Sequence, residues 1–201
     1  MQLLLTSIGL TNKKITDNLL AMLPKKPKDC SVLVVAFTRN EREELFRDET
    51  RKILKKLGFG SVSDFNLTDK KFSGKQKFDV VYVCGGNTFY ILDRMRKTGI
   101  DEFIKKSVLD EDVVYVGASA GSIIAGPDIS IAGWGSTGDA NDTKLKDLTG
   151  LQFVDFTLYP HYESKLKKEV EAFRQSVSCH VIEITDDQAV YADDLGYRMI
   201  K

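Results

Sequence analysis

The sequence has few cysteines, no excess of either charge and no long hydrophobic run, and each shortage excludes a class of protein. The three cysteines, Cys30, Cys84 and Cys179, are far apart and odd in number, so they form neither a metal-binding spacing nor a disulfide framework. This usage suits a reducing compartment, and we expect a cytoplasmic protein. The 29 basic and 29 acidic residues balance, so we expect no nucleic-acid partner.

The N-terminal segment also lacks the features of a targeting signal. Residues 1–7 have an apolar centre, but they carry no basic region and no cleavage site, and they are too short to span a membrane. We therefore interpret them as the first strand of a sheet and expect no membrane partner. Because 201 residues can bury one sizeable core, we predict a single domain over residues 1–201.

Buried-type strands alternate with amphipathic helices along most of the chain. This order predicts an α/β fold with a mostly parallel sheet and helices on both faces. Apolar runs predict strands over 3–7, 31–37, 61–67, 78–84, 113–116, 127–132 and 153–159. Helical spacing predicts helices over 13–22, 41–57, 89–96, 100–109 and 165–177. Short strands over 181–185, 188–192 and 197–200 predict a small antiparallel C-terminal extension, and polar segments at 70–77 and 133–147 predict a turn and a long loop.

One stretch combines a buried strand, a serine between small residues and the start of a helix. Residues 117–121 read Gly-Ala-Ser-Ala-Gly directly after the strand predicted over 113–116. This is the layout of a nucleophile elbow, in which a sharp strand-to-helix turn lifts a serine hydroxyl above the sheet. The turn crowds the backbone, so its flanking residues must be small. We predict that Ser119 is a catalytic nucleophile; the alternative is a tight turn whose serine only caps the helix.

A serine hydroxyl needs a base to take its proton, and the chain has only two histidines. His161 follows Pro160 at the end of a predicted strand. Because proline cannot donate to a sheet ladder, the chain leaves the sheet there, on the same rim as Ser119. His180 begins a strand and should lie at the opposite rim. We therefore assign the role of base to His161.

A carboxylate should orient this histidine, and the residues leave several candidates open. The loop between the elbow helix and the histidine supplies most of them. The candidates are Asp128, Asp139, Asp142, Asp147 and Glu163. Of these we predict Asp139, although Asp and Asn in such loops often serve only to form turns.

Backbone N–H groups beside Ser119 would stabilise the negative charge that develops on a substrate carbonyl oxygen. The N–H of Ala120 follows the serine directly. The Gly85-Gly86 pair follows another predicted strand, and residues without side chains let their N–H groups approach a substrate. We predict an oxyanion hole at Gly86 and Ala120, and substrate binding at Asn87. The alternatives for the glycine pair are a tight turn or a phosphate cradle, but no Walker lysine is present.

Three ordered segments resemble the S51 serine peptidases, the group of aspartyl dipeptidase (peptidase E) and cyanophycinase. They are Gly-Gly-Asn-Thr-Phe at 85–89, Gly-Ala-Ser-Ala-Gly-Ser at 117–122 and Tyr-Pro-His-Tyr at 159–162. The resemblance covers nearly the whole chain. It implies a fold like that of the class I glutamine amidotransferases, of flavodoxin-like type, with serine in place of cysteine at the elbow.

The resemblance also implies a set of site residues. These are Ser119 and His161 as catalytic residues, with an oxyanion hole near Gly86 and Ala120. It places the acidic member between the elbow helix and the histidine, nearest Asp139, and gaps would shift it to Asp142. The implied activity is a serine-dependent hydrolysis of short peptides, like that of a dipeptidase, with no metal or cofactor. We expect a monomer or a homodimer.

The sequence departs from the aspartyl dipeptidases beyond the histidine. They resemble one another there in a Gly-His-x-Gly-Glu-Thr-Arg stretch, whose arginine is linked to the acidic side chain of the substrate. That stretch is absent here, and Lys165, Lys168 or Arg174 would have to substitute. The resemblance therefore implies hydrolysis without implying a preference for aspartate. Two other functions stay open: a small esterase, and a catalytically inactive amidotransferase-like protein that binds a small ligand.

Overall fold

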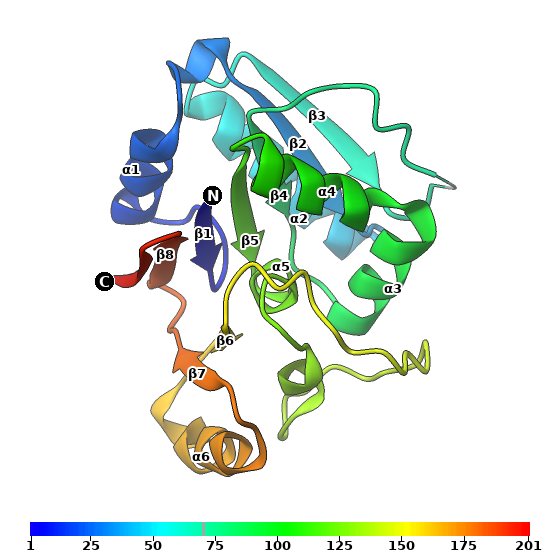
Figure 1. The fold of residues 1–201 in the computed structure, drawn as a ribbon, viewed down its shortest axis with the longest axis vertical. Helices are drawn as coiled ribbons and strands as arrows, with labels where there is room; N and C mark the ends of the chain where they lie inside the picture. Colours follow the sequence, from blue (N-terminus) through cyan, green and yellow to red (C-terminus); the bar gives the residue numbers. More distant parts are fainter. Residues whose placement is uncertain (70) are drawn as a thin grey trace.

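The computed structural model describes residues 1–69 and 71–201 and shows an α/β fold on a seven-stranded sheet (Figure 1). Lys70, the first residue of the predicted turn over 70–77, lies outside the described residues. The strand order is β3-β2-β4-β5-β1-β8-β9. The strands are β1 (Gln2–Thr6), β2 (Ser31–Ala36), β3 (Ser61–Asn66), β4 (Val80–Val83), β5 (Val114–Ala118), β8 (Ala189–Asp193) and β9 (Gly196–Ile200).

The strand directions confirm the predicted fold class. β1 to β5 run parallel to one another, whereas β8 is antiparallel to β1 and β9 is antiparallel to β8. The strands predicted over 188–192 and 197–200 therefore form an antiparallel C-terminal pair, whereas the strand predicted over 181–185 is not part of it. The carboxyl ends of β1, β4 and β5 lie side by side at one rim of the sheet, and ligands of open α/β sheets bind at such rims.

Helices cover both faces of the sheet because alternate strand residues face two separate apolar clusters. Leu4 and Val116 belong to the cluster that includes α1 and α2, whereas Leu5 and Tyr115 belong to the one that includes α3, α4 and α5. The helices are α1 (Lys13–Met22), α2 (Glu41–Lys56), α3 (Thr88–Thr98), α4 (Ile100–Asp110), α5 (Ala120–Ile124) and α6 (Lys167–Ser176). In the described part of the chain, none of them is long and apolar enough to cross a membrane.

Asparagine residues fix where three of these helices begin. Asn12, Asn40 and Asn87 precede α1, α2 and α3, and each side chain accepts a hydrogen bond from the backbone N–H three residues later. Such caps satisfy one of the N–H groups that a helix start leaves without a partner.

A second, smaller sheet lies beside the main one, at the bottom of Figure 1 with α6. It contains β6 (Phe156–Tyr159) and β7 (His180–Glu183), which run parallel and are connected through α6. The strands predicted over 181–185 and 188–192 therefore belong to different sheets. The turn between them carries the chain from the small sheet to the main one.

The strand predicted over 127–132 is wrong. Ser130–Gly133 forms a 3-10 helix, and Asp128 makes only an isolated bridge to Thr149. The Asp128 carboxylate accepts a hydrogen bond from the Ser130 N–H at 2.6 Å, which turns the chain out of an extended conformation. The other short 3-10 helices are Pro27–Asp29 and Ser164–Leu166.

Candidate active site

Ser119 occupies a sharp turn between β5 and α5. Its backbone angles, φ 50° and ψ −109°, are rarely adopted by residues other than glycine, and such strain is concentrated at functional sites. The Ser119 N–H donates to the Thr6 carbonyl at 3.0 Å, which ties the turn to β1. A Cβ atom at Gly117 would lie 2.7 Å from the backbone of Gly121, so no side chain fits. The predicted elbow geometry is present.

The helix that follows Ser119 packs directly on the sheet. A Cβ atom at Gly121 would collide with the Val83 carbonyl oxygen of β4, so glycine is required for this close approach. The buried Tyr115 hydroxyl donates to the Gly121 carbonyl at 2.7 Å. The Ser122 hydroxyl donates to the Thr6 carbonyl at 2.8 Å. Contacts from three neighbouring strands therefore hold the elbow in place.

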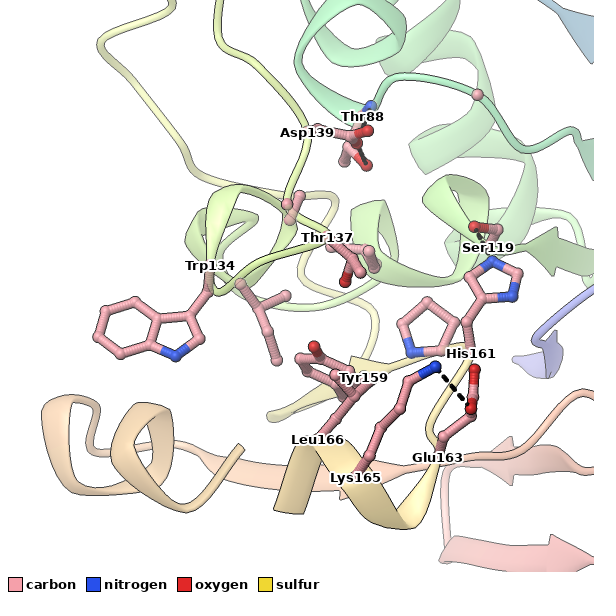
Figure 2. Close-up of a pocket in the computed structure, with 16 residues that line it drawn as sticks. Thr88, Ser119, Trp134, Thr137, Asp139, Tyr159, His161, Glu163, Lys165 and Leu166 are labelled. Atoms are coloured by element: carbon pink, nitrogen blue, oxygen red, sulfur yellow. Dashed lines mark hydrogen bonds and ion pairs between the residues drawn. The ribbon is translucent and has the colours of Figure 1, made fainter. Parts of the chain in front are cut away.

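His161 lies where the chain leaves β6, and its ring faces Ser119 (Figure 2). The Ser119 Oγ and the His161 Nε2 are 2.8 Å apart, which is hydrogen-bond distance. His161 has φ +57°, and its N–H donates to the Ser7 hydroxyl at 2.8 Å. His180 lies at the opposite end of the small sheet, next to Tyr197. The structure thus brings together the serine and the histidine that the sequence pairs.

The carboxylate beside the histidine belongs to Asp186. The Asp186 Oδ1 lies 2.8 Å from the His161 Nδ1, on the side of the ring away from Ser119. Asp186 sits in the turn between β7 and β8. Because β8 is antiparallel to β1, with Ala189 opposite Thr6, this turn reaches the rim that carries Ser119. A chain of serine, histidine and aspartate results, with the arrangement of a catalytic triad.

Ser7 joins this chain from the end of β1. Its side chain is fully buried, and its hydroxyl donates to the Asp186 Oδ1 at 2.7 Å. The same hydroxyl oxygen accepts the N–H of His161. Asp186 and His161, by contrast, keep 55% and 49% of their side chains exposed. The buried Ser7 side chain therefore holds the two exposed residues, Asp186 and His161, in position.

Asp139, the carboxylate predicted to orient the histidine, is placed elsewhere. Its Oδ2 accepts hydrogen bonds from the N–H and the hydroxyl of Thr88, at 2.7 and 2.8 Å. Figure 2 shows Asp139 and Thr88 across the cavity from His161. The reason is that the free N–H groups and positive dipole end of α3 attract a carboxylate. The prediction that Asp139 orients His161 is therefore corrected in favour of Asp186.

The other carboxylate candidates also have different neighbours. Asp147 pairs with Arg96 at 3.3 Å, and Glu163 pairs with Lys165 at 2.9 Å. Within residues 1–69 and 71–201, none of the remaining candidates contacts His161: Asp128, Asp142, Asp147 and Glu163.

A cavity of about 350 Å³ opens beside Ser119 and His161. Gly86, with φ +143°, lines it, and a Cβ atom at Gly85 would lie only 3.2 Å from the Ser119 Cβ. The glycine pair thus lies close to the serine. Ala120 is the first residue of α5, where backbone N–H groups have no acceptor within the helix.

Asn87 and Cys84, which flank the glycine pair, have structural surroundings. The Asn87 side chain caps α3 and donates to the Ala140 carbonyl at 2.9 Å, and it does not line the cavity. The structure therefore does not support the substrate-binding role predicted for Asn87. Burial raises the pKa of the Cys84 thiol to about 12, which keeps it protonated and unreactive. No group of three or more His, Cys, Asp or Glu side chains among the described residues is placed to hold a metal ion.

The sequence reasoning missed Asp186 and Ser7. Asp186 lies in an Asp-Asp pair between the strands predicted over 181–185 and 188–192, where such residues are typical of a turn. Its one usable signal was the antiparallel strand that follows, because pairing of that strand with β1 brings the turn to the rim of Ser119. Ser7 follows the first strand directly, so its place at the same rim was available from the predicted sheet alone.

Comparison with known proteins places these residues in a family. The profile of Peptidase family S51 matches residues 3–200. A peptidase of Listeria monocytogenes is 38% identical over 96 residues, covering 47% of this chain and 45% of that protein. Peptidase E of Salmonella typhi is 29% identical over 124 residues, covering 60% of this chain and 50% of that protein. The chain spans about half the length of the curated relatives it matches.

A solved structure shows the same fold. A crystal structure of a protein from Listeria monocytogenes, described as a peptidase E candidate, matches with a TM-score of 0.79 and 24% identity. The match covers 98% of this chain and 96% of that one, so the small sheet and α6 are included. With the family profile covering nearly every residue, the chain belongs to peptidase family S51.

Proposed function

We propose that this chain is a serine peptidase that hydrolyses short peptides through Ser119. The observation that carries the proposal is the continuous chain of contacts from Ser119 to His161 to Asp186, with 2.8 Å at each step. Membership of family S51 supports it. A histidine between a serine hydroxyl and a carboxylate is the arrangement that converts an unreactive hydroxyl into a nucleophile.

The first half of the proposed reaction forms an acyl-enzyme. The His161 Nε2 takes the hydroxyl proton as the Ser119 Oγ attacks the substrate carbonyl carbon. Asp186 accepts the Nδ1–H of His161, which fixes the ring orientation and stabilises the imidazolium that forms. The N–H groups of Gly86 and Ala120 donate to the oxyanion. His161 then gives its proton to the leaving amine as the C–N bond breaks.

The second half releases the acyl group. His161 takes a proton from a water molecule, whose oxygen attacks the ester carbonyl carbon, and it returns a proton to the Ser119 Oγ as the ester bond breaks. The free carboxylic acid and the original hydroxyl result. Each step uses this chain's own groups and water. We also propose that the protein acts as a monomer or homodimer on peptides, with no nucleic-acid or membrane partner.

The test is release of free amino acid from a library of dipeptides and tripeptides. We compare the wild-type protein with Ser119→Ala and His161→Ala, and we use Ser130→Ala as a matched serine variant outside the site. Turnover by the wild type and by Ser130→Ala, with loss on the order of 10⁴-fold or more in the other two variants, supports the proposal.

Two outcomes would contradict it. Turnover that persists in Ser119→Ala would show that Ser119 is not the nucleophile. Absence of turnover on every peptide, with ester hydrolysis or ligand binding in its place, favours the esterase or the binding protein. Because the same variants are used with peptides and esters, one set of purified proteins separates the three functions.

A further inference from the structure

The cavity beside Ser119 has an apolar base. Six of its lining residues present apolar surface: Ile123, Ile131, Ala132, Trp134, Tyr159 and Leu166. All but Trp134 have less than one tenth of their surface exposed, so the packing of the core fixes this base. A volume near 350 Å³ lies at the small end of the range for small-ligand sites, about 300–1,000 Å³. The cavity therefore has the size for part of a short peptide and the surface for an apolar side chain.

Trp134 is one of the lining residues, and its indole is held by α6. Its indole N–H donates to the Glu169 carbonyl at 2.9 Å, and its ring meets Phe173 edge to face at 5.3 Å. The Glu169 carboxylate also accepts the N–H and the hydroxyl of Ser136, both at 2.9 Å. This part of the lining is thus attached at several points and needs little ordering when a ligand binds.

Tyr159 brings one hydrogen-bonding group into this apolar space. The residue is 6% exposed, and its hydroxyl has no hydrogen-bond partner among the described residues. Figure 2 shows the hydroxyl on the Thr137 side of the cavity. The hydroxyl oxygen is not among the buried polar atoms that lack a partner, so it is open to the cavity and available to bond a ligand there.

The charges at the cavity do not favour an acidic side chain. Lys165 is the one lysine or arginine among the described lining residues, and its Nζ lies 2.9 Å from the Glu163 Oε2 (Figure 2). Asp139 adds a second carboxylate on the opposite wall. Arg174, another candidate for recognising an acid, pairs with Glu171 and Glu183 outside the cavity. An incoming carboxylate would meet two others and one cation that is already paired.

We propose that this cavity is the subsite for a neutral, apolar side chain of the residue next to the scissile bond. The Tyr159 hydroxyl bonds the peptide main chain there. This inference rests on the proposed function for the identity of the ligand as a peptide. It differs from the aspartate preference of the family's dipeptidases, and it follows from the wall composition and the paired Lys165.

The test measures binding without requiring turnover. Calorimetry with Ser119→Ala compares Leu-Ala, Asn-Ala and Asp-Ala, whose first side chains have similar shapes, and repeats the series as Ala-Leu, Ala-Asn and Ala-Asp. In one of the two series we expect the leucine peptide to bind about tenfold or more tightly than the aspartate peptide, with asparagine between them. The series that shows this order identifies the side of the scissile bond on which the cavity lies.

Variants in the Ser119→Ala background locate the preference. Trp134→Leu should weaken binding of the leucine peptide by about threefold or more, because it removes apolar surface from the cavity lining. Leu195→Ala, which changes an almost fully exposed leucine outside the cavity, is the control and should leave affinity unchanged. Tyr159→Phe should weaken all peptides alike by about three- to tenfold. Glu163→Gln should strengthen binding of the aspartate peptide and leave binding of the other peptides unchanged.

Two results would overturn the inference: tighter binding of the aspartate peptides, or an affinity for the leucine peptide that Trp134→Leu and Tyr159→Phe both leave unchanged. These failures are distinct from failure of the proposed function. A wild type that releases no amino acid contradicts the peptidase, whereas the binding order in Ser119→Ala is measured independently of catalysis.

Discussion

Ser119 and its two partners are held by regions of very different construction. Ser119 sits on the main sheet, between a buried strand and a helix, with glycines on both sides that leave no room for side chains. His161 and Asp186 lie on exposed loops at the ends of the small sheet, more than 40 and 65 residues further along the chain. Ser7, at the end of β1, hydrogen-bonds to both of them and so connects them to the main sheet.

The difference teaches that the nucleophile and its partners depend on different parts of the fold. The position of Ser119 follows from close packing of β4, β5 and α5, so damage there should reduce stability and activity together. The positions of His161 and Asp186 follow from a few hydrogen bonds at an exposed rim. Damage there should reduce activity while stability changes little, since half-exposed polar contacts contribute little to folding.

The largest expected effect on kcat distinguishes Asp186, which contacts His161, from Asp139, which contacts Thr88. We expect Asp186→Asn to lower kcat by about 10³–10⁴-fold, because an amide can hold His161 in the wrong tautomer. Asp139→Asn should lower kcat less than about threefold, and its loss should appear in stability, since a helix cap contributes about 1 kcal/mol. Steady-state kinetics and thermal unfolding of both variants test this. A larger kcat loss in Asp139→Asn would return the orienting role to Asp139.

A smaller effect is expected from disturbing the close packing of the main-sheet region that carries Ser119. Gly121→Ala forces a Cβ atom against the Val83 carbonyl, and we expect a loss of about 1–3 kcal/mol in unfolding free energy together with lower activity. Gln188→Ala is the matched change on the loop side, because its side chain accepts one hydrogen bond there, from the Thr185 N–H. Urea unfolding should show little change for Gln188→Ala. Equal destabilisation of the two variants would remove the distinction between the regions.

Ser7→Ala should weaken the link between the two regions. Loss of its hydroxyl removes one hydrogen bond from Asp186 and one from the His161 N–H, and we expect kcat to fall about tenfold with KM nearly unchanged. The pH profile of kcat/KM should shift as well. Ser122→Ala is the control, because this buried hydroxyl donates only to the Thr6 carbonyl. The account fails here if both variants lose stability and neither profile shifts.

The smallest effect concerns Asp79, far from the site on the sheet. Burial raises the pKa of its carboxyl, but hydrogen bonds from Ser31 and the ion pair with Lys25 outweigh this and lower it overall. A carboxylate with a lowered pKa adds stability above its unfolded pKa, and that stability is lost as the pH falls through the folded value. Asp79→Asn should therefore cost about 1 kcal/mol at pH 7. The difference in unfolding free energy between Asp79→Asn and the wild type should shrink below pH 3.8. The substitution should leave kcat unchanged.

The parts of the fold that depend on local pattern were predictable from the sequence. The parallel strands, the helices between them and the elbow at Ser119 depend on apolar spacing and small residues that the sequence displays directly. His161 followed from the scarcity of histidine and the position of Pro160. Asp186 was not predicted because its position depends on β7 pairing with β6 while β8 pairs with β1. Strand pairing of this kind leaves no local signal, and the loop at 133–147 offered a nearer carboxylate.

The most direct test of the central claim is the rate at which Ser119 reacts with a fluorophosphonate, followed by intact mass and peptide mapping. The account predicts labelling at Ser119 in the wild type and in Asp139→Asn, and labelling slowed by orders of magnitude in Asp186→Asn and in His161→Ala. Labelling that is unaffected in Asp186→Asn, or that occurs at another residue, would contradict a nucleophile activated by His161 and Asp186.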